Sequence, residues 1–412
     1  MTRRIAATAI ACLVALACGR TARAEPAKVP PEVARLYQQT PVIELVTMGV
    51  GALIWERHGH IALCVRYDDP RDHVCYNYGV GDFGHPATMA WGFLRATGAF
   101  WVAKALFEDT LWIYHHTDRT IWIQPLPLTA AQKQQVIAKL EHDILVPNRY
   151  YAYDHFLDNC TTRVRDVIDE AIGGKLAALT GPPDDRTFRD LAREGFYGMT
   201  LPLLATDIAM GRATDRVPTY YERMFLPQYL REAVTQLWGI QPIAVYTRQG
   251  DAPSTDPASG RGWLVLVILV LTAPAWLGRW TGRLPRGSMA IAVVPYVVLG
   301  CAMWFTAIIS PLGYVRWNEL CLVVLPLDVL LLVLPAAARR RYARGRLAML
   351  AAIGVLSLVG VLKQPLLSVG LWPLIPLAVT GFWPERTARG GLVGTLSAGP
   401  ANAAPRAANQ RR

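Results

Sequence analysis

The feature that most constrains this chain is a change in composition near residue 262. From there to Trp383 the sequence consists of long apolar runs separated by short basic loops. Each run is about long enough to cross the roughly 30 Å of hydrocarbon in a bilayer as a helix. We therefore predict an all-α membrane domain of about five helices, with spans at 262–278, 289–310, 319–337, 347–362 and 366–383.

The N-terminus is typical of a secretory signal peptide. Arginines precede an apolar run from Ile5 to Leu16, and Ala22-Arg23-Ala24 provides a small-residue cleavage site. We predict that residues 1–24 are a signal peptide. Cleavage as a lipoprotein before Cys18 is an alternative that the sequence favours less.

The distribution of arginine indicates the orientation of the spans. Arginines gather in the loop after the first span, the loop after the third span and the basic tail at 384–412. The positive-inside rule puts these segments in the cytoplasm, so residues 25–248 and a Gly-, Pro- and Ser-containing linker at 249–261 lie outside it. Much of the net charge of +11 is explained in this way. No basic and aromatic nucleic-acid motif accompanies the charge, and we expect no nucleic-acid partner.

The exported half has the pattern of an α+β domain. Alternating apolar residues and turn signals predict strands at 42–50, 58–66, 74–79, 110–116 and 119–126. Helical periodicity predicts helices near 32–39, 129–145, 160–169, 185–194 and 218–238. Strands that precede a set of helices indicate the α+β class.

The hairpin around Asp68–Arg71 predicts a strand register. If the turn is centred between Asp69 and Pro70, Cys64 lies opposite Cys75 and Ala62 opposite Asn77, with His60 on the same face.

This register gives the cysteines different expected fates. In an oxidising compartment, Cys64 and Cys75 are plausible disulfide partners, which leaves Cys160 as the unpaired thiol of the exported domain. An unpaired exported thiol is usually retained for chemistry. The alternative is that Cys64 and Cys75 remain as reduced core residues.

Cys160 is the predicted nucleophile. It follows Asn159, a good helix N-cap, and precedes Thr161 and Thr162 at the start of a helical pattern. Backbone N–H groups at a helix N-terminus stabilise a thiolate and a developing oxyanion, so these residues have expected positioning or oxyanion roles. The alternative is an inert buried cysteine beside an N-cap.

His60 is the predicted general base, because a sheet can hold it rigidly beside a nucleophile. His58, on the same face, and His155, close to the cysteine in sequence, are alternatives. Asn77 and Asp82 are the candidates for the group that orients the imidazole. The cysteine and histidine spacings match no metal-binding motif, and we expect neither a metal nor a cofactor.

Several motifs together resemble the Lnb-type N-terminal periplasmic domain family. They are Gly59-His60-Ile61-Ala62-Leu63, Tyr76-Asn77-Tyr78-Gly79 with Asp82-Phe83, Tyr151-Ala152-Tyr153-Asp154, Asp158-Asn159-Cys160-Thr161-Thr162-Arg163 and Phe225-Leu226-Pro227-Gln228-Tyr229-Leu230. The resemblance covers about residues 40–240. It implies a circularly permuted papain-like fold, in which the histidine strand precedes the cysteine helix. Ile61 departs from the family, which often has a small hydroxyl residue there.

The resemblance also implies an activity and a location. Family members are linked to lipoprotein N-acylation, in which an acyl chain passes from a phospholipid donor through an enzyme thioester to the N-terminal amine of a diacylglyceryl-cysteine lipoprotein acceptor. This implies Cys160 as nucleophile and His60 as base, in a multi-pass protein of the bacterial inner membrane with a periplasmic catalytic domain. The alternatives are a periplasmic cysteine hydrolase, acting as peptidase, amidase or phospholipase, and a non-catalytic membrane sensor or scaffold.

Overall fold

The computed structural model describes residues 30–82, 84–97, 100–258, 260–281 and 287–383. The predicted signal peptide and the predicted cytoplasmic tail lie outside the described residues. The chain divides into two compact units. Unit 1 contains the N-terminal part up to Gly260 together with Thr306–Asn318, and unit 2 contains Arg261–Phe305 and the chain from Glu319 onward.

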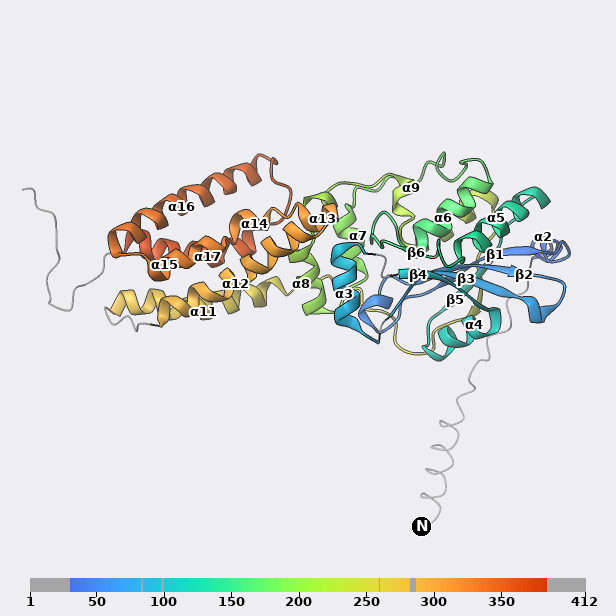
Figure 1. Ribbon diagram of the computed structural model, residues 1–412, viewed down its shortest axis with the longest axis horizontal. Helices are drawn as coiled ribbons and strands as arrows, with labels where there is room; N and C mark the ends of the chain where they lie inside the picture. The colour runs from blue at the N-terminus through green and yellow to red at the C-terminus, as the bar shows by residue number, and fades with distance from the viewer. Residues whose placement is uncertain (1–29, 83, 98–99, 259, 282–286, 384–412) are drawn as a thin grey trace, which may run out of the picture. The chain divides into compact units, whose positions relative to one another are not determined.

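An antiparallel sheet is the centre of unit 1 (Figure 1). It has seven strands in the order β6-β4-β3-β2-β1-β5-β7. The strands are β1 Val42–Met48, β2 His60–Arg66, β3 Val74–Gly81, β4 Phe100–Leu106, β5 Ile121–Pro125, β6 Tyr150–Tyr151 and β7 Ile243–Tyr246. Strands β1, β2, β3 and β5 lie where the sequence predicts strands, and the predicted mixed α+β class is confirmed.

The β2–β3 hairpin has the central register that its turn predicts. Cys64 lies opposite Cys75, and the paired stretch extends to Leu63 and Tyr76. A disulfide joins the two cysteines, whose Cα atoms are 4.0 Å apart. Because the pairing stops at Leu63, β2 and β3 separate before they reach His60, at the end of the sheet where the candidate site lies.

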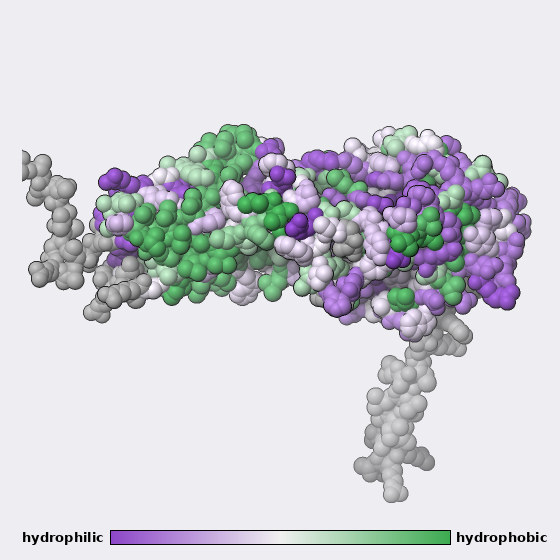
Figure 2. Space-filling view, viewed as in Figure 1, coloured by the Kyte–Doolittle hydropathy of each residue, from purple (hydrophilic) through white to green (hydrophobic). Residues whose placement is uncertain are grey.

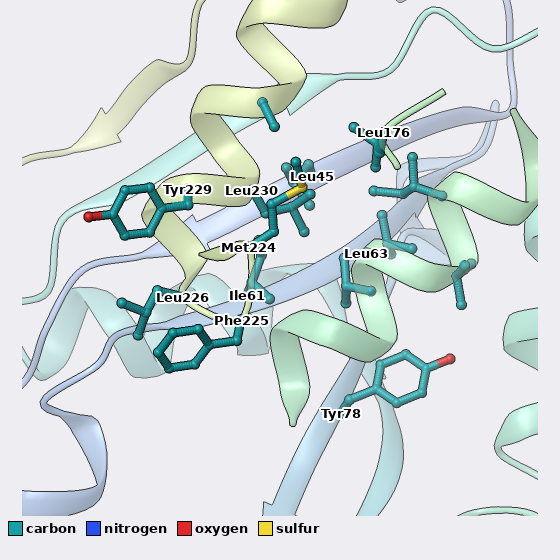
Figure 3. Packing of buried hydrophobic residues seen from close by; sticks show 14 of the residues in the cluster. Leu45, Ile61, Leu63, Tyr78, Leu176, Met224, Phe225, Leu226, Tyr229 and Leu230 are labelled. Atoms are coloured by element: carbon teal, nitrogen blue, oxygen red, sulfur yellow. The ribbon is translucent and has the colours of Figure 1, made fainter. Parts of the chain in front are cut away.

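One face of the sheet is covered by three helices that share a large core with it (Figure 3). They are α5 (Ala130–Asp143), α6 (Cys160–Ala171) and α10 (Pro227–Trp238). Helix α6 forms because its apolar residues recur at positions i, i+3, i+4 and i+7, namely Val164, Val167, Ile168 and Ala171. These side chains pack against apolar residues of β1, β2 and β3 such as Leu45, Ile61, Leu63 and Tyr78.

The opposite face is covered by α4 (Phe107–His116), so the strand predicted at 110–116 is wrong. Phe107, Leu111 and Tyr114 recur at helical spacing and pack on the second apolar cluster, which contains the disulfide. Two acidic residues in the first turn favour the positive end of the helix dipole. The residues after Thr110 taken alone favour a strand. The helical spacing becomes clear only when Phe107 is included.

Shorter helices complete unit 1. They are α2 Pro31–Leu36, η1 Ile54–Glu56, η2 Pro70–Asp72, α3 Pro86–Arg95, α7 Phe188–Glu194, α8 Thr200–Ala209, η3 Arg212–Thr214 and α9 Tyr220–Arg223. The helix predicted at 218–238 is divided into α9 and α10, because Leu226 is extended and Pro227 begins a new helix.

Unit 1 also includes a segment from far along the chain. Thr306–Asn318, which the sequence assigns to the membrane domain, contains α13 (Gly313–Arg316). Tyr314 is 8% exposed, and its ring meets that of Phe156 edge to face with centroids 4.9 Å apart. The backbone of Arg212 donates to Trp317 O at 2.8 Å. The core of unit 1 is therefore made from two separate stretches of sequence.

Unit 2 is helical, and hydrophobic residues gather on its surface (Figure 2). Its elements are α11 Arg261–Thr281, α12 Ser288–Ile309, α14 Leu320–Val323, η4 Pro326–Val329, α15 Leu330–Val333, α16 Ala336–Leu358 and α17 Leu367–Phe382; the end of α12 lies in Thr306–Asn318. By length and composition, α11 and α12 are the helices among the described residues that qualify to cross a membrane. They coincide with the first two predicted spans.

The third predicted span, 319–337, is not one helix. It is divided into α14, η4 and α15, with prolines at 326 and 335. Asp328, in this stretch, is fully buried and receives a two-point bond from Arg346 at 2.9 and 3.1 Å and a third from Tyr342 at 2.7 Å. Asp328 thus holds the broken segment to α16 through a buried ion pair.

Candidate functional site

The candidate nucleophile, Cys160, is the first residue of α6, as predicted. The buried Asn159 caps the helix: its Oδ1 accepts from the backbone N–H of Thr161 at 2.8 Å and of Thr162 at 2.9 Å. Its Nδ2 donates to the carbonyl oxygens of His155 at 2.7 Å and Phe225 at 2.9 Å. Asn159 therefore fixes the position of Cys160 on both sides.

This cap changes the expected roles of the two threonines. Their backbone N–H groups donate to Asn159 Oδ1. Thr162 Oγ1 accepts from the Asn159 N–H at 2.8 Å, and Thr161 Oγ1 lies 3.8 Å from the Cys160 sulfur. Both residues hold the start of the helix in place.

The electrostatic environment of the thiol differs from the sequence expectation. Burial raises the pKa of Cys160, against opposing hydrogen bonds from the Thr161 hydroxyl and from the backbone N–H groups of Thr161, Cys160 and Ile61. The helix N-terminus therefore does not by itself produce a thiolate, because desolvation outweighs it. The thiol needs a base.

Gly79 makes room for the thiol. It lies at the end of β3 with φ of +79°, and a Cβ on it would be 3.2 Å from Cys160 Cβ. β3 also shifts register against β4 between Asn77 and Val80. A residue with a side chain would be strained here and would press on the cysteine.

His60, the predicted base, begins β2 and is held by Asn77. His60 Nε2 lies 3.3 Å from Asn77 Oδ1. Because Oδ1 is an acceptor, Nε2 carries the proton and Nδ1 is the free basic nitrogen. Burial and the positive charge of Arg119 lower the pKa of His60 to about 4, against the opposing effect of the Asn77 bond, so the ring is neutral at neutral pH.

The thiol and the imidazole share two neighbours, Tyr114 and Arg119. The backbone N–H of Ile61, the residue after His60, opposes the rise in the pKa of the Cys160 thiol. Tyr114 of α4 stacks on His60 with ring centroids 5.9 Å apart, and the Cys160 thiol acts electrostatically on both Tyr114 and Arg119. Elements from both faces of the sheet therefore contribute to one site.

The structure separates Asp82 from this site. Its carboxylate accepts from His85 Nδ1 at 2.7 Å and from the Gly84 N–H at 3.1 Å, and its side chain is 61% exposed. These bonds and this exposure place Asp82 with His85 rather than with His60, so the structure gives no support to Asp82 as the group that orients His60. Asn77 has that position.

The other candidate bases have structural partners. His58 Nε2 is bonded to Ala192 O at 2.8 Å, and its ring meets that of His155 edge to face with centroids 4.7 Å apart. Burial lowers the pKa of each. They form a packed pair in which burial favours the neutral rings, whereas His60 has an amide partner, Asn77, that orients its ring.

Arg119 and Tyr114 are residues of the site that the sequence analysis missed. Arg119 is 4% exposed, and its guanidinium carbon lies 4.7 Å from the centre of the Tyr114 ring. The sequence analysis predicts a strand at 110–116 and therefore does not bring Arg119 onto the Tyr114 ring. Their contact depends on the turn that follows α4.

Within the described ranges, no group of three or more His, Cys, Asp and Glu side chains is arranged to hold a metal ion. A thiol with a neutral imidazole that is oriented by an amide can open an ester, amide or thioester through a covalent acyl intermediate.

Comparison with known proteins gives the family of this domain. Residues 34–194 match the family described as the Lnb N-terminal periplasmic domain. No curated protein and no solved structure matches the chain significantly. Together with the two apolar helices, the family description indicates a membrane protein with a periplasmic N-terminal domain. The match over residues 34–194, which include both His60 and Cys160, confirms the resemblance predicted from the motifs.

Proposed function

We propose that this protein is a membrane-bound thiol acyltransferase. It moves an acyl chain from a phospholipid to the N-terminal amine of a diacylglyceryl-cysteine lipoprotein, through a thioester on Cys160. The observation that carries the proposal is the capped Cys160 at the start of α6 together with the neutral His60 held by Asn77. The permuted papain-like interpretation also suits the chain order, since the histidine strand precedes the cysteine helix.

The first half-reaction forms the thioester. His60 Nδ1 takes the Cys160 proton, and the thiolate attacks the carbonyl carbon of a lipid ester. A C–S bond forms and the ester C–O bond breaks. The leaving lysophospholipid oxygen takes the proton from His60.

The second half-reaction returns the enzyme to its resting state. The lipoprotein amine attacks the thioester, a C–N bond forms and the C–S bond breaks. The amine proton passes to His60 and then to the sulfur. A thioester suits this step because amines attack it more readily than they attack the lipid ester.

The pKa shifts are consistent with a nucleophile that is activated on demand. Burial raises the pKa of Cys160, and burial with the charge of Arg119 lowers that of His60, so both groups are neutral at rest. Proton transfer then accompanies attack on a bound ester.

Two features support work on membrane substrates. The helices α11 and α12 are long and apolar enough to span a bilayer. Both the chain before Gly260 and the segment Thr306–Asn318 belong to unit 1, which suits a pair of spans that leaves and returns on the same side of the membrane. An enzyme anchored in this way meets lipids at a high effective concentration.

Intact-protein mass spectrometry tests the proposal. Full-length protein in detergent micelles is incubated with phospholipid, and then with a diacylglyceryl-cysteine peptide. We expect a hydroxylamine-labile acyl mass on Cys160 that disappears when the peptide becomes N-acylated. Cys160→Ser and His60→Ala remove the acyl mass.

Matched variants identify non-specific acylation. Cys301 is an exposed free cysteine and His115 is an exposed histidine, so Cys301→Ser and His115→Ala should retain full acylation. If folded wild type stays unmodified, the transferase proposal fails. If fatty acid is released to water while the peptide stays unmodified, the enzyme is a hydrolase.

A further inference from the structure

Arg119 has a buried charged donor without a partner. Its Nε donates to Gly49 O at 2.8 Å, and its side chain is 4% exposed. The Nη2 group is buried and has no hydrogen-bond partner. A buried unpaired donor on a charged group costs about 1–3 kcal/mol or more, so it calls for an acceptor.

Glu56 does not satisfy this donor. Its Oε1 lies 3.6 Å from Arg119 Nη1, beyond hydrogen-bond distance, and its Oε2 accepts from the Leu53 N–H at 3.1 Å. Glu56 therefore faces Nη1 and leaves Nη2 without an acceptor. Arginine is the side chain best suited to bind a phosphate in such a buried position.

The guanidinium belongs to the same site as the reacting groups. It lies over the Tyr114 ring, which stacks on His60. Its charge acts on His60, and the Cys160 thiol acts on it in return. An anion on Nη2 would therefore lie near the ester that the thiol attacks.

The surface beside Glu56 is apolar. Leu53, Ile54 and Trp55, directly before Glu56, are 49%, 46% and 43% exposed. Consecutive exposed apolar residues are unusual on a soluble surface and suit contact with lipid. A ligand with one buried anion and an apolar part that meets this turn is a phospholipid.

We propose that Arg119 Nη2 binds the phosphodiester of the acyl donor, so that the site selects glycerophospholipids over neutral glycerides. This inference rests on the proposed thioester chemistry and specifies its donor. Arg119 positions the donor by its phosphate and takes no part in bond making at the ester.

The test compares two donors that carry the same acyl chains. Acylation rates of Cys160 in the full-length protein are measured by mass spectrometry with phosphatidylethanolamine and with diacylglycerol, in the same micelles. We expect Arg119→Gln to slow acylation by phosphatidylethanolamine about 10- to 100-fold, the loss of one or two hydrogen bonds to a charged group. The rate of acylation by diacylglycerol should fall much less in this variant than the rate with phosphatidylethanolamine.

The ratio of the two rates is the readout, because partial unfolding or a changed His60 pKa slows both donors equally. Arg248→Gln is the matched control: Arg248 also donates to backbone oxygens, of Asp118 and Val50, each at 2.9 Å. The ratio of the two acylation rates in Arg248→Gln should equal the wild-type ratio. The ratio in Arg119→Lys should lie between those of wild type and Arg119→Gln.

The outcomes separate the two proposals. If wild type forms no thioester with either donor, the proposed function fails and this inference fails with it. If wild type is acylated but Arg119→Gln slows both donors equally, or neither, phosphate binding by Arg119 is refuted while the thioester chemistry stands.

Discussion

Replacing Asn159 with alanine should loosen the start of α6 far more than removing an ordinary helix cap. Asn159 accepts from two backbone N–H groups and donates to two buried carbonyl oxygens. Loss of the cap costs about 1 kcal/mol. Loss of two further buried hydrogen bonds adds about 1 kcal/mol each. The total of about 3 kcal/mol corresponds to roughly a 100-fold change in an equilibrium constant.

Hydrogen exchange measures this effect where it occurs. Full-length protein in micelles is labelled in D₂O, and the peptide that contains Thr161 and Thr162 is followed by mass spectrometry. We expect its amides to exchange about 100-fold faster in Asn159→Ala, because exchange follows the free energy of local opening.

Two variants separate the contributions. Thr129 caps α5 with a single bond to the Gln132 N–H at 3.3 Å, so Thr129→Ala should speed exchange at the start of α5 only about fivefold. Asn159→Asp keeps the acceptor but places an anionic oxygen against the carbonyl oxygens of His155 and Phe225, so its exchange should be well above that of Thr129→Ala. If exchange in Asn159→Ala resembles that in Thr129→Ala, the donated bonds contribute nothing and the reasoning is wrong.

Four further predictions concern the site and its support. Gly79→Ala should reduce Cys160 acylation about tenfold or more, because the new Cβ is strained at a φ of +79° and also lies 3.2 Å from Cys160 Cβ. Gly174 has the same φ but open space around it, so Gly174→Ala should show the effect of backbone strain alone. Because the pKa of His60 is lowered to about 4, the acylation rate should fall on the acid side with a midpoint near pH 4 rather than near pH 6.5. A midpoint near pH 6.5 would contradict the burial argument. Between pH 6.5 and 4 the unfolded chain binds more protons at His60 than the folded protein does. The folding stability that neutral His60 contributes, up to about 3 kcal/mol, is therefore lost as the pH falls through this window. The thermal unfolding temperature of His60→Gln should consequently depend less on pH than that of wild type. Tyr314→Ala removes a buried ring from the core of unit 1 and should cost about 3–5 kcal/mol, seen as faster exchange in the peptide before Cys160; unchanged exchange would show that the ring is dispensable.

Local signals in the sequence predicted the parts of the site that depend on neighbouring residues. The turn at Asp69 and Pro70 was enough to place Cys64 opposite Cys75. The Asn159 cap was enough to place Cys160 at a helix start. Each prediction rests on hydrogen-bonding rules that act over a few residues.

Features that depend on the complete fold could not be predicted in this way. Whether Asn77 or Asp82 meets His60 depends on an irregularity at the end of β3, and its cause lies in the pairing with β4, a strand that the sequence analysis missed. The pKa of Cys160 depends on burial, which opposes the helix terminus. The burial of Arg119 could not be predicted, because nothing near it in the sequence indicates that it is buried.

The segment Thr306–Asn318 makes the N-terminal unit a discontinuous domain. Tyr314, which packs on Phe156 in the loop before Cys160, is synthesised only after residues 261–305. At roughly 5–20 residues per second, that delay is about 2–9 s. During this interval the loop that leads to the nucleophile lacks part of its core. We therefore expect the thiol site to mature only after the first two apolar helices have been made, so that order of synthesis links the completion of the site to the anchoring of the chain.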